Sequence, residues 1–212
     1  MSTATVISIN VANPNSRAIA RAVTALSDGL LVVAPTETRY GLLARADSPN
    51  ALDRMMAAKQ RPASMPVAVF APSVHRIPQL AILNRQGKAL AEKFLPGPLT
   101  LILDNRSKLA PPCVQHKKIG IRVSPSKVIA SILEQLSFLV TATSANLSGE
   151  RDAENIDDIV IALRDSVALY LDGGSLSNVV STVVDCTVDP VVIVREGAIS
   201  RFDIESVAGV AA

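Results

Sequence analysis

The sequence of 212 residues is poor in the residues on which several common kinds of site depend. It contains no Trp, and aromatic residues make up 3% of it, which argues against a nucleic-acid platform built on base stacking. Its two His residues, His75 and His116, are too few for a histidine-based metal site or a Ser-His-Asp triad. Its two Cys residues, Cys113 and Cys186, make neither a disulfide framework nor a zinc site. Walker A, G-x-G-x-x-G and H-E-x-x-H motifs are absent.

Targeting and membrane signals are also missing from the sequence. The N-terminal segment lacks the basic start and the long apolar run of a signal peptide. No stretch approaches the ~20 apolar residues that a membrane span needs. A chain with so few cysteines fits a reducing compartment. We therefore expect a soluble, cytoplasmic protein without a membrane partner.

The residues that are abundant are aliphatic, and the charges are unevenly placed. Hydrophobic residues make up 49% of the chain, as is typical of buried parallel strands. Residues 1–150 carry 17 Lys and Arg against 8 Asp and Glu, whereas residues 151–212 carry 4 against 11. The basic part favours an anionic partner such as a nucleotide, a phosphate or RNA. The alternative is two solvated faces of a body whose net charge is only +2.

Helix-like and strand-like segments alternate along the chain. Helical spacing and cap signals predict helices over 16–28, 49–60, 80–95, 126–136 and 156–164, and a last short helix near Asp203. Apolar runs predict strands over 30–35, 40–46, 66–71, 99–103, 119–123, 138–143, 167–171, 181–186 and 191–195. This alternation predicts an α/β fold with a mixed sheet, in a single domain over 1–212.

Polar segments stand where these elements end. Hydroxyl residues in 35–41 follow a predicted strand, and 141–149 combines small hydroxyl and amide groups in the manner of a phosphate cradle. Lys59 and Arg61 suit phosphate oxygens. Because Pro62 ends the helix, we expect both cations to project from a loop and to add little to the core. The alternative interpretations are a capped turn at 35–41 and helix-dipole partners at 59 and 61.

Seven short motifs follow one another along the chain. They are P-T-E-T-x-Y-G-L at 35–42, K-x-R-P at 59–62, P-G-P-L-T at 96–100, I-G-I-R-V at 119–123, T-S-A-N-L-S-G at 143–149, S-T-V-V-D at 181–185 and R-E-G-A-I at 195–199. In this order they resemble the YrdC-like threonylcarbamoyl-AMP synthases, in the short, single-domain form. The resemblance implies a twisted mixed β-sheet flanked by helices, with a concave basic cavity.

The resemblance also implies a reaction and the residues that serve it. The family joins L-threonine, bicarbonate or CO2 and ATP into threonylcarbamoyl-AMP and pyrophosphate, for the t6A modification of tRNA, with Mg2+ accompanying ATP. By motif position, the residues expected to be catalytic and to bind ATP are Lys59, Arg61, Ser144 and Asn146, with Lys118 and Arg195 as further ATP ligands. Those expected to bind threonine are Thr38, Arg122, Ala142 and Ser181. No metal site on the protein is implied, and a sheet-edge salt bridge is the alternative role of Arg122.

Three places depart from the family's pattern, and two other functions stay open. Phe70 stands where the family has a His, Arg39 stands in place of a Val, and 173–180 lacks the usual Pro and Gly. One alternative is a divergent YrdC-like paralogue that binds nucleotide or RNA without threonine chemistry. The other is a module that recognises tRNA or double-stranded RNA through phosphate contacts. For the synthase, we also expect transient contact with the threonylcarbamoyl transferase machinery.

Overall fold

The computed structural model describes residues 5–62, 64–149, 155–177 and 179–209. Its strands are β1 (Thr5–Ser8), β2 (Val32–Pro35), β3 (Tyr40–Leu43), β4 (Ala68–Phe70), β5 (Ala81–Ile82), β6 (Leu99–Asn105), β7 (Val114–Gln115), β8 (Lys118–Arg122), β9 (Val140–Ser144), β10 (Leu169–Asp172), β11 (Thr182–Asp185) and β12 (Val192–Arg195). Its helices are α1 (Ser16–Ser27), α2 (Pro49–Ala58), α3 (Ile77–Leu80), α4 (Arg85–Phe94), α5 (Lys127–Leu133), α6 (Ile156–Leu163) and α7 (Arg201–Ala208), with short 3-10 turns η1 (Val74–Arg76) and η2 (Arg164–Ser166).

The described strands form one twelve-stranded sheet of mixed direction. Its path runs β1-β10-β2-β3-β9-β4-β8-β6-β11-β12, with β5 beside β6 and β7 beside β8. The neighbours β1/β10, β10/β2, β4/β8 and β11/β6 are parallel, and the other pairs are antiparallel. The predicted α/β fold with a mixed sheet is confirmed. No helix in the described part of the chain is both long and apolar enough to cross a membrane.

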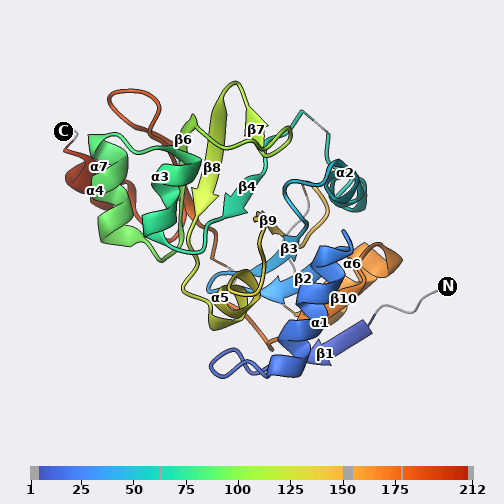
Figure 1. Cartoon of the computed structure of the whole chain (residues 1–212). Helices are drawn as coiled ribbons and strands as arrows, with labels where there is room; N and C mark the ends of the chain where they lie inside the picture. The colour runs from blue at the N-terminus through green and yellow to red at the C-terminus, as the bar shows by residue number, and fades with distance from the viewer. Residues whose placement is uncertain (1–4, 63, 150–154, 178, 210–212) are drawn as a thin grey trace.

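Helices cover the sheet through aliphatic stripes. On α1, Ile19, Ala22 and Leu26 recur at helical spacing and are buried together with Val128 and Ile132 of α5. These two helices pack on β10 and β2, while α4 packs against α7 and β6 (Figure 1). The strands between these helix pairs, β4 and β8 among them, therefore have a face on which a ligand site can form.

Capping residues explain where the sequence predicts a helix correctly and where it does not. Ser48 accepts a hydrogen bond from the Ala51 amide and Pro49 is the first helical residue, as predicted for α2. The prediction of one helix over 80–95 is wrong. Asn84 accepts from the Gly87 amide and starts α4 at Arg85, and the preceding residues form α3 and β5 instead.

Other differences lie at short elements. The strands β1 and β7 were not predicted, because β1 has only two apolar residues and no buried residue, and β7 has only two residues. The last helix begins at Arg201 rather than near Asp203, because Ser200 caps it by accepting from the Asp203 amide. These differences leave the order of the central strands, and thus the site, unchanged.

Candidate active site

An open cavity of about 630 Å³ lies over one face of the central strands. Alternate residues of a strand face the same side of a sheet, so much of the floor is formed by every second residue of the central strands. The floor residues are Ala142 and Ser144 of β9, Ala68 and Phe70 of β4, Lys118, Gly120 and Arg122 of β8, Thr100 and Ile102 of β6, and Val183 and Asp185 of β11. Segments far apart in the sequence thereby share one surface.

Most of the residues predicted from the motifs lie in this cavity. Those that line it are Thr38, Arg61, Lys118, Arg122, Ala142, Ser144, Ser181 and Arg195. Lys59 and Asn146 lie behind the lining, in contact with Ser144. The charged side chains in the described lining are those of Arg39, Arg61, Lys118, Arg122, Arg195 and Asp185, so the lining carries an excess of positive charge.

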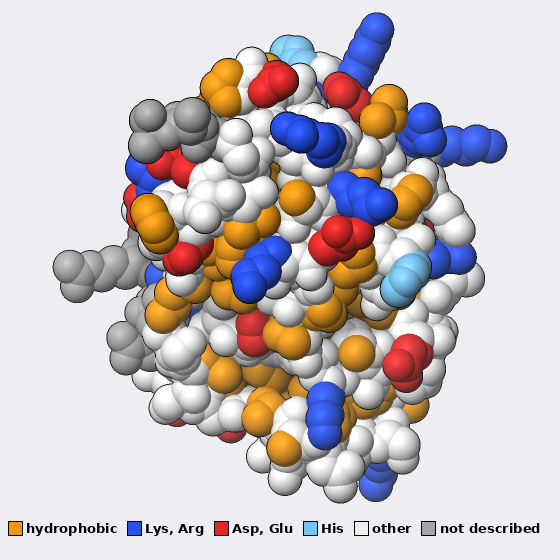
Figure 2. Space-filling model, turned by 90° about the vertical axis from the view of Figure 1, so that its left-hand side faces the viewer, with side chains coloured by type: hydrophobic (Ala, Val, Ile, Leu, Met, Phe, Trp, Pro, Cys, Tyr) orange, Lys and Arg blue, Asp and Glu red, His pale blue; other side chains and the backbone are white. Residues whose placement is uncertain are grey.

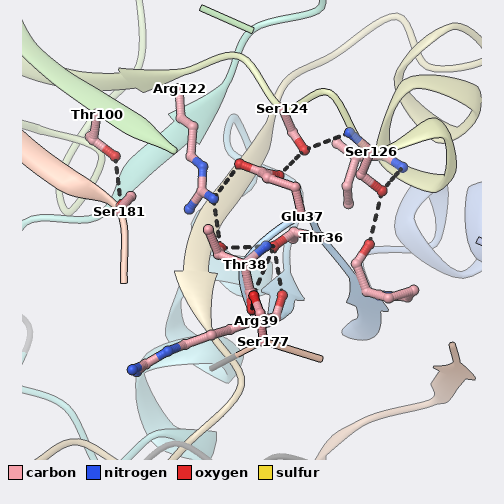
Figure 3. Close-up of polar contacts among 12 residues, drawn as sticks. Thr36, Glu37, Thr38, Arg39, Thr100, Arg122, Ser124, Ser126, Ser177 and Ser181 are labelled. Atoms are coloured by element: carbon pink, nitrogen blue, oxygen red, sulfur yellow. Dashed lines mark hydrogen bonds and ion pairs between the residues drawn. The ribbon is translucent and has the colours of Figure 1, made fainter. Parts of the chain in front are cut away.

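Arg122 lines the cavity and is held by an internal carboxylate (Figure 3). Its Nη2 donates to Glu37 Oε1 at 2.5 Å and to Thr38 Oγ1 at 2.7 Å. Ser124 Oγ donates to the other oxygen of Glu37. Arg122 is 9% exposed, yet its buried Nε has no hydrogen-bond partner in the described residues. Arg122 is therefore both the ion-pair partner considered from the sequence and a cavity residue whose orientation is fixed before a ligand arrives.

Lys59 ties helix α2 to the end of β9. It is the C-cap residue of α2, and its Nζ donates to Ser144 O, to Asn146 O at 2.7 Å and to Asn146 Oδ1 at 3.1 Å. Ser144 Oγ also donates to Asn146 Oδ1, at 2.6 Å. We call Lys59, Ser144 and Asn146 the buried junction. Three acceptors match the three protons of an ammonium, so this contact organises the Ser-x-Asn segment.

The expectation that Lys59 projects from a loop and adds little to the core is wrong. Its side chain is 1% exposed, among the largest fully buried side chains. Burial, and then the nearby charge of Arg61, lower the pKa of Lys59 to about 7. Lys59 is the C-cap residue of α2, so the chain leaves the helix only at Gln60, where φ is 49°, and the Lys59 side chain meets the oxygens of Ser144 and Asn146 instead of solvent.

Arg61 and Arg195 differ from Lys59 because they line the cavity. Arg61 Nη2 donates to Pro66 O at 2.8 Å, and its buried Nε lacks a partner in the described residues. Arg195 donates to Ser181 O and, at 3.0 Å, to Ser181 Oγ. Burial lowers the pKa of both arginines, and the charge of Arg122 lowers that of Arg195 further. We call Arg61, Arg122 and Arg195 the cavity wall.

Lys118 meets a carboxylate from the neighbouring motif. Its Nζ donates to Asp185 Oδ2 at 2.8 Å, with side chains 36% and 17% exposed. Burial alone raises the pKa of Asp185, but the hydrogen bonds from Lys118 and Thr187 outweigh it and lower the pKa. Asp185 stands in S-T-V-V-D, yet the sequence analysis gave it no role, because its partner lies 67 residues away.

Other residues of the site were missed for similar reasons. Glu37 is the acidic residue of the first motif and follows a strand. This position could have suggested it as an ion-pair partner for Arg122. Thr100 Oγ1 lies 3.3 Å from Ser181 Oγ and belongs to P-G-P-L-T, the motif given no role. His116 lines the cavity from a turn that the sequence analysis did not predict.

Among the described residues, the cavity lining offers neither a reactive thiolate nor a ligand cluster for a metal ion. Cys113 lines it, but burial raises the pKa of this thiol to about 12. The described residues contain no group of three or more His, Cys, Asp or Glu that could hold a metal ion. Asp185 and Glu37 are engaged by Lys118 and Arg122. Because both carboxylates are already paired with cations, they do not fit a protein-held Mg2+ ion, which takes an octahedron of oxygen ligands.

Comparison with known proteins places the chain among relatives of similar sequence. The model of the Sua5/YciO/YrdC family, described as "Telomere recombination", matches residues 24–197. The threonylcarbamoyl-AMP synthase of Pyrococcus abyssi is 32% identical over 188 residues, which are 87% of this chain and 55% of that protein. The chain thus spans little more than half the length of this curated relative.

Solved structures agree with the sequence comparison. The crystal structure of P. abyssi Sua5 complexed with L-threonine has a TM-score of 0.90 at 31% identity, covering 97% of this chain and 61% of that one. The crystal structure of E. coli YciO has a TM-score of 0.86 at 27% identity, covering 93% of this chain and 97% of that one. The matched family model, the shared fold and the convergence of the motifs on one cavity show that the chain belongs to the Sua5/YciO/YrdC family.

Proposed function

We propose that the protein is a threonylcarbamoyl-AMP synthase, which joins L-threonine, bicarbonate or CO2 and ATP. The observation that carries the proposal is a single cavity lined by Arg61 and Ser144 and also by Arg122, Thr38 and Ser181. The first pair suits phosphate oxygens, and the second group suits the carboxylate and hydroxyl of an amino acid. The name of the P. abyssi relative and its structure with L-threonine support this proposal.

The reaction makes two new bonds and breaks one bond of ATP. The threonine nitrogen bonds to the carbon of CO2 and loses a proton, which gives a carbamate; with bicarbonate as the source, water leaves. A carbamate oxygen then attacks the α-phosphorus in line, and the bond from that phosphorus to the oxygen of pyrophosphate breaks. Negative charge grows on the departing pyrophosphate, so catalysis depends on positioning and on cations.

The residues of the cavity suit this chemistry without a protein nucleophile. Arg61 and Arg195 donate to neutral oxygens of Pro66 and Ser181, so their charge stays available to phosphates. Arg122 is already oriented by Glu37, so little rotamer entropy is lost when it meets a carboxylate. The carbamate is fragile in water, and a hollow in the sheet face limits its contact with solvent.

Mg2+, cellular location and further partners belong to the proposal as expectations. Because the cavity residues do not fit a protein-held ion, Mg2+ is expected to arrive with the phosphates of ATP and to balance their charge. The protein is expected to act in the cytoplasm. Its adenylate is expected to pass to the threonylcarbamoyl transferase machinery for t6A modification of tRNA.

Pyrophosphate release tests the proposal directly. The protein is incubated with ATP, Mg2+ and bicarbonate, and with threonine, serine, alanine or no amino acid. Release is expected only with bicarbonate and an amino acid together, and fastest with threonine. Serine is the closest competitor, since one methyl group is worth about 1–3 kcal/mol in a pocket. Equal release of pyrophosphate with every amino acid, or equal release without any amino acid, would overturn the proposal that the protein is a synthase.

A divergent paralogue that binds nucleotide without threonine chemistry is the second candidate. Phe70 favours it, because this residue lines the cavity with a ring, 5.8 Å from the Arg122 guanidinium, where the family's His would supply a polar group. ATP binding without threonine-dependent release of pyrophosphate would establish it. Binding of tRNA or double-stranded RNA is less well supported, because acidic side chains lie among the basic ones on the face in Figure 2.

A further inference from the structure

The turn before β3 brings a cation into the cavity at a position where the family's pattern has an apolar residue. Arg39 stands in the first motif in place of a Val, and it lines the cavity. Its carbonyl accepts hydrogen bonds from the Thr36 amide at 3.1 Å and from Thr36 Oγ1 at 2.6 Å. Its amide donates to Thr36 Oγ1 at 3.2 Å. These bonds fix the backbone of Arg39, so its side chain enters the cavity from a defined position.

The side chains of Thr38 and Arg39 leave this turn in different directions. Thr38 Oγ1 accepts a 2.7 Å hydrogen bond from Arg122, whose other partner is Glu37. The Arg39 side chain extends away from the Arg122–Glu37 pair (Figure 3). Two consecutive residues of one motif therefore reach the cavity at two separate places.

Arg39 approaches Arg195, which comes from the other end of the central sheet. Five strands separate β3 from β12 along the sheet, namely β9, β4, β8, β6 and β11, so the sheet must curl for both arginines to line one cavity. Burial, and then the charge of Arg195, lower the pKa of Arg39. Arg195 donates to Ser181 Oγ at 3.0 Å, and Ser181 belongs to the pocket proposed for threonine. Arg39 therefore adds a cation beside that pocket.

The carboxylates near this end of the cavity already have cationic partners. Glu37 is paired with Arg122, and Asp185, the carboxylate of the described lining, is paired with Lys118. Threonine brings one carboxylate to Arg122. The carbamate formed from threonine carries a second carboxylate, on the nitrogen, and one of its oxygens attacks the α-phosphorus. A ligand with two carboxylates therefore matches two guanidinium groups that lie at separate places.

We propose that Arg39 is a specificity-determining residue that binds the second carboxylate, as the carbamate and as the bicarbonate from which the carbamate forms. The proposal rests on the proposed function, because it takes threonine as the ligand of Arg122. A guanidinium holds a planar carboxylate through two parallel N–H donors, which a Val at this position lacks. The site also favours bicarbonate over CO2, because only bicarbonate is charged. Arg39 then holds the carbamate beside Arg195, the residue expected to contact ATP.

A matched pair of ligands isolates the second carboxylate. N-oxalyl-L-threonine carries two carboxylates, and N-acetyl-L-threonine has a methyl group in place of the one attached through nitrogen. We expect calorimetric titration to show that the wild type binds the N-oxalyl compound more tightly. Arg39→Val should weaken this binding roughly tenfold to hundredfold and leave the affinities for N-acetyl-L-threonine and inorganic pyrophosphate unchanged. Arg39→Lys keeps the charge but not the fork, so its affinity should lie between those of the wild type and Arg39→Val.

Arg17→Ala is the control for the overall charge of the protein. Arg17 is exposed on α1 and lies outside the cavity lining, so this variant should bind all three ligands as the wild type does. An equal loss of affinity in Arg17→Ala would trace the effect to net charge and overturn the inference. The melting temperature of Arg39→Val should equal that of the wild type, because Arg39 is only half-buried.

Three further outcomes would overturn the inference. The first is a wild type that binds both threonine compounds equally, and the second is an Arg39→Val variant that keeps the preference for the N-oxalyl compound. The third is an equal loss for pyrophosphate, which would assign Arg39 to the phosphates of ATP.

Pyrophosphate release is measured separately, at varied bicarbonate concentration. Arg39→Val should raise the KM for bicarbonate roughly tenfold or more and leave the KM for threonine unchanged. A wild type that prefers the N-oxalyl compound through Arg39 but releases no pyrophosphate would refute the proposed function and leave the carboxylate site standing. Threonine-dependent release with unchanged binding in Arg39→Val would refute the inference alone, so the two failures are distinguishable.

Discussion

The buried junction and the cavity wall use neighbouring cations of one motif in different ways. In the junction, Lys59 is 1% exposed and its ammonium is shared by three oxygens of Ser144 and Asn146. In the wall, Arg61 lines the cavity, and its Nε has no partner in the described residues. From the K-x-R motif alone, the same role would be expected for Lys59 and Arg61. The difference in burial distinguishes Lys59, which holds the site together, from Arg61, which can contact a ligand.

Arg122 is buried like Lys59 and also borders the cavity like Arg61, so burial alone does not decide whether a cation can bind a ligand. It depends on Glu37 for its counter-charge. A buried cation can therefore serve a ligand when a carboxylate of the same chain keeps it charged and oriented. The following changes test this division, from the largest expected effect to the smallest.

Glu37→Ala should have the largest effect, on stability. It leaves the buried charge of Arg122 without its counter-charge, so the free energy of unfolding should fall by roughly 3–5 kcal/mol. Urea denaturation measures this. The double variant Glu37→Ala/Arg122→Met is the control, because removing both charges should restore part of the loss. If the double variant is no more stable than Glu37→Ala, the ion pair is not the cause.

Lys59→Met should unfold more easily than Arg61→Met. The first change keeps the apolar stem but leaves the carbonyls of Ser144 and Asn146 without a donor, which should cost roughly 3 kcal/mol. For a chain of this length, that lowers the melting temperature by roughly 6–12 °C. Arg61→Met should melt within ~2 °C of the wild type. Equal melting temperatures for the two variants would remove the distinction between junction and wall.

Arg61→Ala should instead lower activity. Loss of a charge-assisted contact to phosphate should reduce the rate of pyrophosphate release roughly tenfold to hundredfold, with little change in melting temperature. Arg201→Ala is the matched control, because Arg201 is exposed and paired with Glu205 on α7. Full turnover in Arg61→Ala would show that Arg61 does not contribute to the active site.

Asp185→Asn should have the smallest effect, a loss of stability that is present at neutral pH and disappears at acid pH. The pKa of Asp185 is lowered from its ordinary value of 3.8, so its contribution to stability is present above that value and is lost as pH falls through the lowered pKa. Because Lys118 is 36% exposed, the contribution should be under ~1 kcal/mol. Urea unfolding between about pH 2 and 6 should show a shallower acid slope for the variant. Identical slopes would show that the pair adds nothing.

The fold is largely readable from the sequence, because its signals are local. Aliphatic runs predict the central strands, and Ser48 with Pro49 predicts the start of α2. The prediction fails over 80–95, where apolar residues continue the helical spacing but Asn84 caps a new helix. Pairing with β6 then turns the residues before it into β5, a tertiary effect that local spacing does not carry.

The sequence identifies most residues of the site, but it does not show what role each of them has. Motif order groups the residues that line the cavity, and the resemblance to a family assigns them to ATP or threonine. The burial of Lys59 depends on carbonyls of a strand end 85 residues away, and the Arg122–Glu37 pair also joins residues 85 apart. The turn at His116 contains no Asn or Gly, the residues by which such a turn is usually predicted. Such contacts follow from the sheet register, which the sequence alone does not give.

The central claim is that one cavity joins threonine, inorganic carbon and ATP into a single adenylate. The most direct measurement is mass spectrometry of the products formed from ATP, L-threonine and carbon-13 bicarbonate, with wild type and Arg61→Ala side by side. We predict an adenylate that contains both threonine and the labelled carbon, formed only when all three substrates are present, and at least roughly tenfold less of it with Arg61→Ala. Pyrophosphate without this adenylate, or a labelled adenylate formed without threonine, would contradict the claim.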